Sequence, residues 1–341
     1  MRFTIDPGSR DAIYRQLVSQ VEQALHSGKL KAGEQIPSMN ELAAKLNISR
    51  ETVKKAYGIL VKKGLIQPKQ GKGFYTADIN ASGHLRVLVI FDKFSIYKQL
   101  LFNAFAEQVS GAAEITILNH NQSIDLLEHY LDDNLDNFDF YLLAPHFPLD
   151  EATQQRAVKQ LSRIPYRKLI MLDRLQPGFP GQYGAVYQDF ENDIYDGLTE
   201  EMDAASLNRR LRVITLPMSL YGSHVVKGVK RFVTQNHVQA EFMTSVPDSI
   251  ERGDTFLLLN SQLDAGLVSL THKIQQAGLI IGRDVFIISY NESDMNELVL
   301  GGLTTVSTDF REMGRLAARM VLTHQLDKVH CPFHMNRRHT F

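Results

Sequence analysis

The sequence predicts an α/β protein in which a small N-terminal winged helix-turn-helix is joined to a larger two-lobed domain of parallel β-sheets. At 341 residues the chain is too long for one typical core, so we expect two domains. Residues 1–76 hold 13 Lys and Arg against 6 Asp and Glu (+7), and the remainder holds 24 against 32 (−8), which together give the net charge of −1. Beyond residue 85, short apolar runs alternate with amphipathic helical stretches, a pattern typical of βαβ units.

Three helices are expected in the basic part. Tyr14, Leu17, Val21 and Leu25 mark the first helix, which ends at a turn where Gly28 supplies a left-handed cap. Ser38, followed by Glu41, forms a capping box that starts a second helix of about nine residues. Ser49 caps the third helix, whose apolar stripe comprises Val53, Ala56, Tyr57, Leu60 and Val61. Its opposite face carries Arg50, Lys54 and Lys55, so this pair of helices predicts a recognition helix for the DNA major groove.

A β-hairpin wing is expected after the third helix. The run LIQPKQGKGFYT contains two extended segments around a Gly-Lys-Gly tip, and it lacks the G-x-x-x-x-G-K-[ST] pattern of a phosphate-binding loop. Gly71 allows the backbone to approach a groove closely, while Lys69, Gln70 and Lys72 supply contacts to DNA. Clustered cations in this part of the chain are suited to neutralising phosphates.

Residues 14–76 closely resemble the winged helix-turn-helix of GntR-type transcription regulators. The matched pieces are Y-x-Q-L, the S-G-x-L-x-x-G-x-x-x-P-S turn, E-L-A, S-R-x-T-V-x-x-A and the G-L-I…Q-G-x-G-F wing. Of three positions where the family usually has a DNA-contacting arginine, this chain keeps Arg50 and has Asn40 and Lys54 at the other two. Because lysine lacks the bidentate fork of arginine, we expect an operator unlike the family's common one. Glu51 either accepts a hydrogen bond from cytosine or stabilises the helix dipole. The complete set of expected DNA contacts is Ser38, Asn40, Ser49, Arg50, Thr52, Lys54, Lys55, Gln70, Gly71 and Lys72.

A small, polar linker at residues 77–84 precedes the larger domain at 85–341. In open α/β sheets ligands bind at the carboxyl ends of the strands, so the residues that follow each apolar run are candidates for an effector site. They are polar or aromatic and include no nucleophile paired with a base, which favours a sugar ligand over catalysis. The candidates are Asp92, Phe94, Tyr97, His146, Asp173, Arg174, His224, Asn260, Asn291 and Phe310.

The larger domain is similar to the sugar-sensing domain of LacI-type repressors, and the match is most specific in GRDVFIISYNES…LTTVSTDFREMGRLAARMVL. The resemblance implies that Asn291, Asn260, Asp173 and Phe310 occupy ligand-binding positions, and that Asn291 replaces the usual acid. Val225 stands where the family has a sugar-binding arginine, although His224 lies beside it. A GntR-type reader on a LacI-type sensor is similar to arabinose-responsive regulators, which suggests a pentose or a deoxyhexose as the effector.

These observations together predict a homodimeric, cytoplasmic repressor that a sugar releases from DNA. Activation, or a non-sugar or phosphorylated effector, remains the alternative. The chain shows no context for the Schiff-base lysine of an aminotransferase-like domain, so we expect neither an enzyme nor a cofactor. His330, Cys331, His334 and His339 lack the paired spacing of a zinc site, so no metal is expected. A single cysteine and the lack of an apolar signal or membrane-length segment agree with the cytoplasm.

Overall fold

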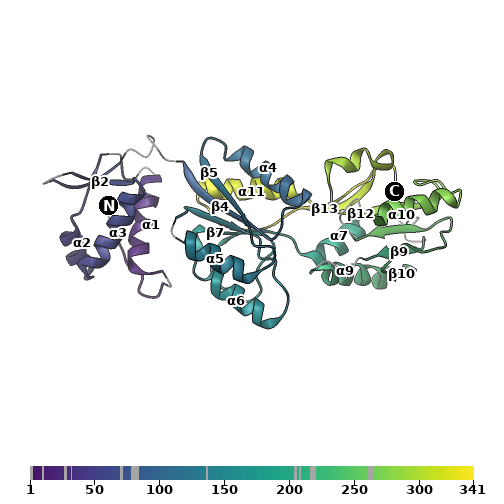
Figure 1. Ribbon diagram of the computed structural model, residues 1–341, viewed down its shortest axis with the longest axis horizontal. Coiled ribbons are helices and arrows are strands. Elements are labelled where there is room, and N and C mark those ends of the chain that lie inside the picture. The colour runs from purple at the N-terminus through teal and green to yellow at the C-terminus, as the bar shows by residue number, and fades with distance from the viewer. Residues whose placement is uncertain are drawn as a thin grey trace. The chain divides into compact units, whose positions relative to one another are not determined.

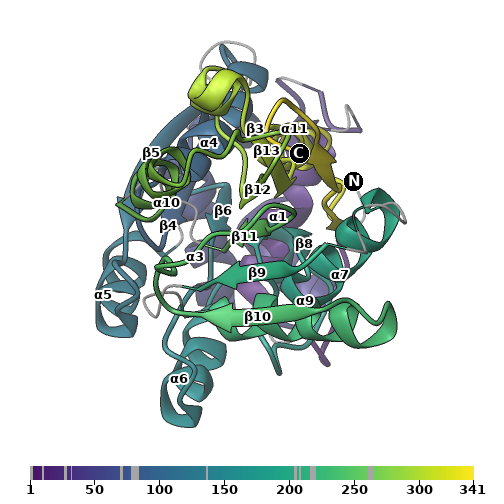
Figure 2. The same cartoon turned by 90° about the vertical axis from the view of Figure 1, so that its right-hand side faces the viewer.

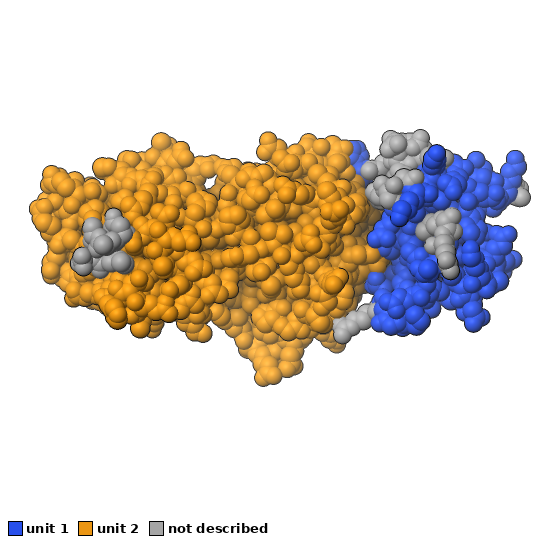
Figure 3. Space-filling model, turned by 180° about the vertical axis from the view of Figure 1, so that it is seen from behind, with its two compact units in different colours: residues 1–84 blue, residues 85–341 orange. Residues whose placement is uncertain are grey.

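The computed structural model describes residues 3–9, 11–26, 29–31, 33–69, 72–77, 84–135, 137–202, 206, 209–215, 220–259 and 265–341. The chain forms two compact units, residues 1–84 and residues 85–341, which are coloured separately in Figure 3. The predicted linker lies almost wholly outside the described residues, as do Gly28, Gln70, Gly71 and Asn260. None of the helices in the described ranges is long and apolar enough to cross a membrane.

The first unit is a winged helix-turn-helix, as the sequence predicts (Figure 1). Its helices are α1 (Ile13–His26), α2 (Met39–Leu46) and α3 (Arg50–Lys62). The wing strands β2 (Ile66–Lys69) and β3 (Gly73–Thr76) pair antiparallel, and β1 (Gln35–Ile36) pairs with the other edge of β3. The sequence analysis missed β1 because a two-residue strand is too short to leave an alternating pattern.

The predicted helix caps are present in the first unit. The Ser38 side chain accepts from the Glu41 backbone N–H, and the Glu41 carboxylate accepts from the Ser38 N–H, which completes the capping box. Ser49 accepts from the Thr52 N–H at the start of α3. One expectation was wrong: Val61 is 38% exposed and does not join the buried stripe. It lies 100° around the helix from the buried Leu60, which carries its side chain beyond the core.

The first lobe of the larger unit is a parallel sheet in the order β14-β8-β7-β6-β4-β5. Its strands are β4 (Leu85–Phe91), β5 (Ala113–Asn119), β6 (Phe140–Leu143), β7 (Leu169–Asp173), β8 (Gly184–Tyr187) and β14 (Lys328–His330). Helices α4 (Ile96–Gln108) and α11 (Phe310–Thr323) cover one face, and α5 (Ile124–Asn134) and α6 (Glu151–Leu161) cover the other.

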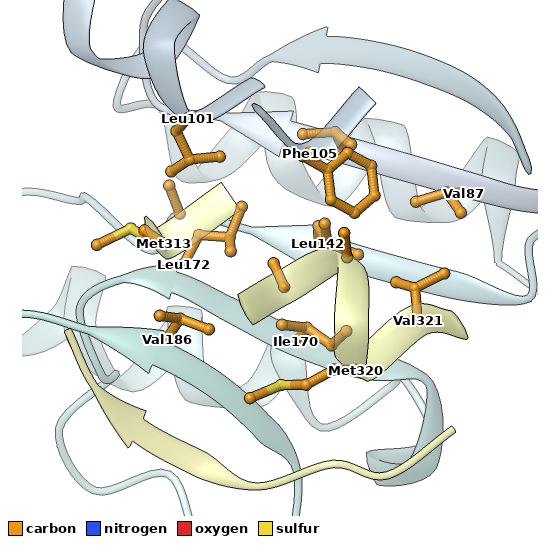
Figure 4. Close-up of a cluster of buried hydrophobic side chains, with 14 of the residues drawn as sticks. Val87, Leu101, Phe105, Leu142, Ile170, Leu172, Val186, Met313, Met320 and Val321 are labelled. Carbon is orange, nitrogen blue, oxygen red and sulfur yellow. The ribbon is translucent and has the colours of Figure 1, made fainter. Parts of the chain in front are cut away.

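The continuous apolar run of β4 is explained by burial on both faces. Val87, Val89 and Phe91 pack beneath α4 and α11, whereas Leu88 and Ile90 pack beneath α5 and α6. Figure 4 shows side chains of α4 and α11 meeting those of the strands in the first of these layers.

The second lobe has the order β10-β9-β11-β12-β13-β15. Its strands β9 (Leu211–Ile214), β10 (Ala240–Met243), β11 (Thr255–Leu258), β12 (Phe286–Tyr290) and β13 (Thr304–Thr308) are parallel, and β15 (Phe333–Asn336) is antiparallel to β13. Helices α7 (Phe190–Glu201) and α9 (Gly222–Gln235) lie on one face, and α10 (Ala265–Gln276) lies on the other (Figure 2). Short 3₁₀ turns occupy Tyr166–Lys168, Asp294–Glu297 and Val299–Gly301.

The chain passes between the two lobes three times, at residues 188–189, 308–309 and 331–332, and we call these three crossings the hinge. Backbone bonds tie the crossings together: Cys331 N donates to Tyr187 O (2.7 Å), and Asp309 N donates to Pro332 O (2.9 Å). The Thr308 hydroxyl donates to Gln188 Oε1 at 2.9 Å inside the hinge. Each lobe therefore contains at least two separate segments of the chain.

Candidate functional site

The cationic side of α3 is exposed, as predicted. Arg50, Lys54 and Lys55 are all solvent-accessible, while the other side of the helix packs against α1 and α2. The three cations do not share one environment. Lys54 Nζ lies 3.4 Å from the Glu51 carboxylate, and Lys55 Nζ lies 4.0 Å from the centre of the Tyr14 ring on α1. Arg50 and Lys54 therefore lie on one flank of α3, and Lys55 lies on the flank facing α1.

The hydroxyls expected to hold phosphates also shape the start of α3. The Ser49 and Thr52 hydroxyl oxygens are 2.8 Å apart, and both remain at the protein surface. Asn40 is exposed on α2, and Lys72 is exposed where the wing turns into β3. These residues place polar groups at the starts of two helices and at the wing, which is the arrangement that backbone contacts to DNA require.

In the first lobe, three of the predicted strand-end residues meet at the carboxyl edge of the sheet. Asp92 follows β4, His146 follows β6 and Asp173 ends β7, and all three are at least nine-tenths buried. His146 Nε2 lies 2.9 Å from Asp173 Oδ2. Lys98 of α4 was not among the predicted residues. Its Nζ contacts the Asp173 carboxylate and lies 3.5 Å from Asp92 Oδ1.

The charges of this cluster stabilise one another. Burial by itself would raise the pKa of both Asp92 and Asp173, but the Lys98 ammonium and His146 outweigh burial and lower the pKa of each carboxyl. Burial would lower the pKa of Lys98, yet the two carboxylates raise it. At nearby His120 burial outweighs the hydrogen bond to Ala144 O and the charge of Asp92, and its pKa falls to about 4. The carboxyl edge of the sheet therefore holds the ionised side chains of Asp92, Lys98 and Asp173, and the neutral imidazole of His120 lies nearby.

Asp173 also connects this cluster to the hinge. Its second carboxylate oxygen accepts from the Gln188 side-chain amide, and the Gln188 carbonyl oxygen accepts from Thr308. A continuous, buried polar chain thus runs from α4 through the end of β7 to two of the three crossings.

Asp173 and Asn291 have the same unusual backbone conformation. Asp173 is the last residue of β7, and Asn291 directly follows β12. Each has a φ of +73°, in the left-handed region that non-glycine residues seldom adopt. Such conformations concentrate at functional sites, where the surrounding structure holds them in place. Asn291 Oδ1 is buried and has no hydrogen-bond partner among the described residues, so it is available as an acceptor.

A pocket of about 220 Å³ opens between the lobes beside this edge. Two predicted effector residues, Arg174 and His224, line it, together with Leu175, Tyr187, Gln188, Asp189, Phe190, Glu191 and Tyr221. Tyr221 joins the two lobes, since its hydroxyl donates to Phe147 O at 3.0 Å and its ring lies 4.9 Å from that of His146. The Phe190 ring stacks on Tyr221 with an angle of 3° between their planes.

The predicted aromatic residues do not line this pocket. Phe310 is buried in the core of the first lobe and packs 5.4 Å from the Tyr97 ring. Phe94 is 53% exposed, beside Phe91. Phe190 and Tyr221 supply the pocket's aromatic surface instead. They begin α7 and α9, so strand-end reasoning missed them, although their places at helix starts following strands offered a signal.

The C-terminal histidines form no metal site. His330 Nε2 contacts Asp193 Oδ1 at 2.6 Å, and Cys331 is buried in the hinge with its thiol donating to Asp309 O. Burial raises the pKa of Asp193 to about 6 and also raises the pKa of the Cys331 thiol. Within the described ranges, no three His, Cys, Asp or Glu side chains gather as metal ligands would.

The fold defines a two-lobed α/β domain joined to a winged helix-turn-helix. Residues 13–76 match the model of bacterial regulatory proteins of the gntR family, and residues 231–336 match that of the periplasmic binding protein-like domain. The chain therefore carries a GntR-type DNA-binding domain and a periplasmic-binding-protein-like domain, which confirms both predicted resemblances.

Known proteins resemble this chain in parts. It is 36% identical over 74 residues to the HTH-type transcriptional repressor YtrA of Bacillus subtilis, covering 22% of this chain and 57% of YtrA. The chain spans between a quarter and little more than half of the first curated relatives that it matches. The Escherichia coli trehalose repressor structure aligns with a TM-score of 0.58 and 15% identity over 74% of this chain and 100% of that one. A LacI family regulator of Enterococcus faecium with bound ribose aligns with a TM-score of 0.54 and 16% identity over 75% and 98%. These structural matches show the LacI-type fold of the larger domain.

Proposed function

We propose that the protein is a transcription repressor that binds operator DNA through residues 1–76 and leaves it when a small sugar or sugar derivative binds between the lobes of residues 85–341. The observation that carries this proposal is the pocket at the hinge of a two-lobed domain whose chain also bears a GntR-type reader. The ribose held by the E. faecium regulator of the same fold supports a sugar, and a pentose or deoxyhexose remains our first expectation.

The ligand acts by selecting one arrangement of the lobes. Arg174 belongs to the first lobe and His224 to the second, so a ligand touching both binds better when the lobes are closed. Only a ligand that prefers one arrangement shifts the equilibrium between them. The altered arrangement then changes how a pair of DNA-binding domains fits its two half-sites, and repression is relieved.

A homodimer is part of this proposal because two-fold operators match two-fold proteins. The larger unit exposes several large apolar side chains, any of which an interface between two copies could cover. They lie near the start of α4, on the edge strand β5 and around the 3₁₀ turns of the second lobe, and include Phe94, Ile96, Ile117, Met295 and Leu298.

The test begins with selection of bound sequences from a random DNA pool by the full-length protein. Gel shifts on the selected site, repeated with a panel of pentoses and deoxyhexoses, then identify a sugar that releases the DNA. Asn291→Ala should retain DNA binding and lose the sugar response, because Asn291 follows β12 in a left-handed conformation and its amide oxygen has no partner among the described residues. If this variant responds normally, the effector site lies elsewhere; if enrichment fails, the repressor proposal is wrong.

A further inference from the structure

The guanidinium of Arg174 is poorly compensated within the inter-lobe pocket. Its centre lies 4.3 Å from the middle of the Tyr221 ring. Its Nη1 is buried without a hydrogen-bond partner among the residues that the structure describes, and no carboxylate there forms an ion pair with it. A partly buried cation that lacks a counter-charge is costly, because the protein replaces too little of its hydration.

The neighbouring acid does not provide that counter-charge. Asp173 directly precedes Arg174 in the chain, yet its carboxylate is taken by Lys98, His146 and Gln188. The charge of Asp173 is therefore already balanced from within the protein, and Arg174 is the cation of the first lobe that lines the pocket.

The acids of the pocket wall are also engaged. Asp189 caps α7 and accepts from the Asn192 backbone N–H and side-chain amide, at 3.3 Å and 2.6 Å. Glu191 lies 3.9 Å from the Arg231 guanidinium. Neither acid is paired with Arg174, although both line the same pocket.

The start of α9 adds positive potential at the pocket, whereas the start of α7 carries the acids Asp189, Glu191 and Asp193. Helices α7 and α9 both begin in its wall, and α9 has no acidic residue in its first turn and no side-chain hydrogen bond from its N-cap residue Tyr221. Helix N-termini favour anions. Arginine, in turn, binds carboxylate and phosphate groups through two parallel hydrogen bonds.

We propose that the effector carries an acidic group, a carboxylate or a phosphate, that Arg174 binds in the inter-lobe pocket. This inference rests on the proposed sugar-sensing function and narrows its ligand to acidic sugar derivatives.

Matched sugar series provide the test. The full-length protein is titrated by calorimetry with D-ribose, D-ribonate and D-ribose 5-phosphate, and with the corresponding neutral sugar, aldonic acid and sugar phosphate of L-arabinose and L-fucose. Inorganic phosphate alone measures generic anion binding. We expect one acidic derivative to bind at least ten-fold more tightly than both its neutral parent and inorganic phosphate. In each series, comparison of the aldonic acid with the sugar phosphate shows whether the acidic group is a carboxylate or a phosphate.

Substitutions link that preference to Arg174. Arg174→Gln should weaken binding of the acidic ligand at least ten-fold more than it weakens binding of the neutral parent, and Arg174→Lys should restore part of the difference. Arg156→Gln is the matched control, because it removes a guanidinium that is ion-paired on the outer surface of α6. Unchanged circular dichroism of each variant confirms folding.

The outcomes separate this inference from the proposed function. Binding of a neutral sugar as tight as that of its acids, or acid binding that survives Arg174→Gln, overturns the acidic ligand and leaves the sugar sensor intact. If no member of any series binds, the proposal that the protein senses a sugar is contradicted, and so is the proposal of an acidic ligand. The selection of DNA sequences by the full-length protein tests DNA binding through residues 1–76 separately from the sugar and from its acidic group.

Discussion

Replacing Lys98 by methionine tests whether one buried ammonium stabilises the carboxyl edge of the first-lobe sheet, where it contacts Asp92 and Asp173. Lys98 is 5% exposed, and its partners Asp92 and Asp173 are 2% and 4% exposed. Removing one member of a buried ionic group costs about 3–5 kcal/mol, because the remaining charges stay buried without compensation. Asp173 keeps its contacts with His146 and Gln188, so we expect a loss near the lower end, about 3 kcal/mol at neutral pH.

The pH dependence of the loss provides a second check. In the natural protein the pKa of both carboxyls is lowered, so their contribution to stability is present above the ordinary carboxyl pKa of about 4 and is lost as the pH falls below it. Without Lys98, burial and mutual repulsion raise the two pKa values. The variant should then recover part of its lost stability, relative to the natural protein, as the pH falls from about 7 to about 5.

Urea unfolding followed by circular dichroism measures both effects, since the chain has no tryptophan. Lys159→Met, at an exposed position on α6, is the control and should change stability by less than about 0.5 kcal/mol. A loss below about 1 kcal/mol in Lys98→Met, or a loss equal at both pH values, would refute the reasoning.

Three further predictions concern the reader, the packing and the hinge. Arg50→Ala should weaken operator binding by about 1–3 kcal/mol and relax base preference in fluorescence anisotropy; an unchanged footprint would contradict its role. Gly314→Ala should cost about 3 kcal/mol in urea unfolding, because an added Cβ would lie 2.2 Å from a backbone oxygen of α4. Gly58→Ala, in open space on α3, should instead stabilise by about 0.5–1 kcal/mol, and equal effects would show that packing is not the cause. Thr308→Val should cost about 1 kcal/mol through the lost hinge hydrogen bond, whereas Thr255→Val removes a buried hydroxyl unpartnered within the described structure; similar losses would argue against the hinge bond.

The winged helix-turn-helix was predictable because the sequence signals that start its helices are local. The capping box at Ser38 and the cap at Ser49 depend on residues within three positions in the chain, so the starts of α2 and α3 follow from the sequence. The βαβ alternation was equally clear, since strands buried on both faces form uninterrupted apolar runs. Strands β8 and β10 were missed because neither forms an uninterrupted run of large apolar residues: β8 begins with glycine, and β10 contains an exposed glutamate.

The sequence by itself determined the fold class of each domain, the exposure of the cations on α3 and the meeting of Asp92, His146 and Asp173 at the carboxyl edge of the first-lobe sheet. Only the tertiary structure revealed that Lys98 neutralises Asp173, that Phe310 is buried in a core and that Tyr221 and Phe190 line the pocket. The physical reason is distance along the chain. Lys98 and Asp173 are 75 residues apart, and their pairing depends on how α4 packs on the sheet, which no local pattern of side chains encodes.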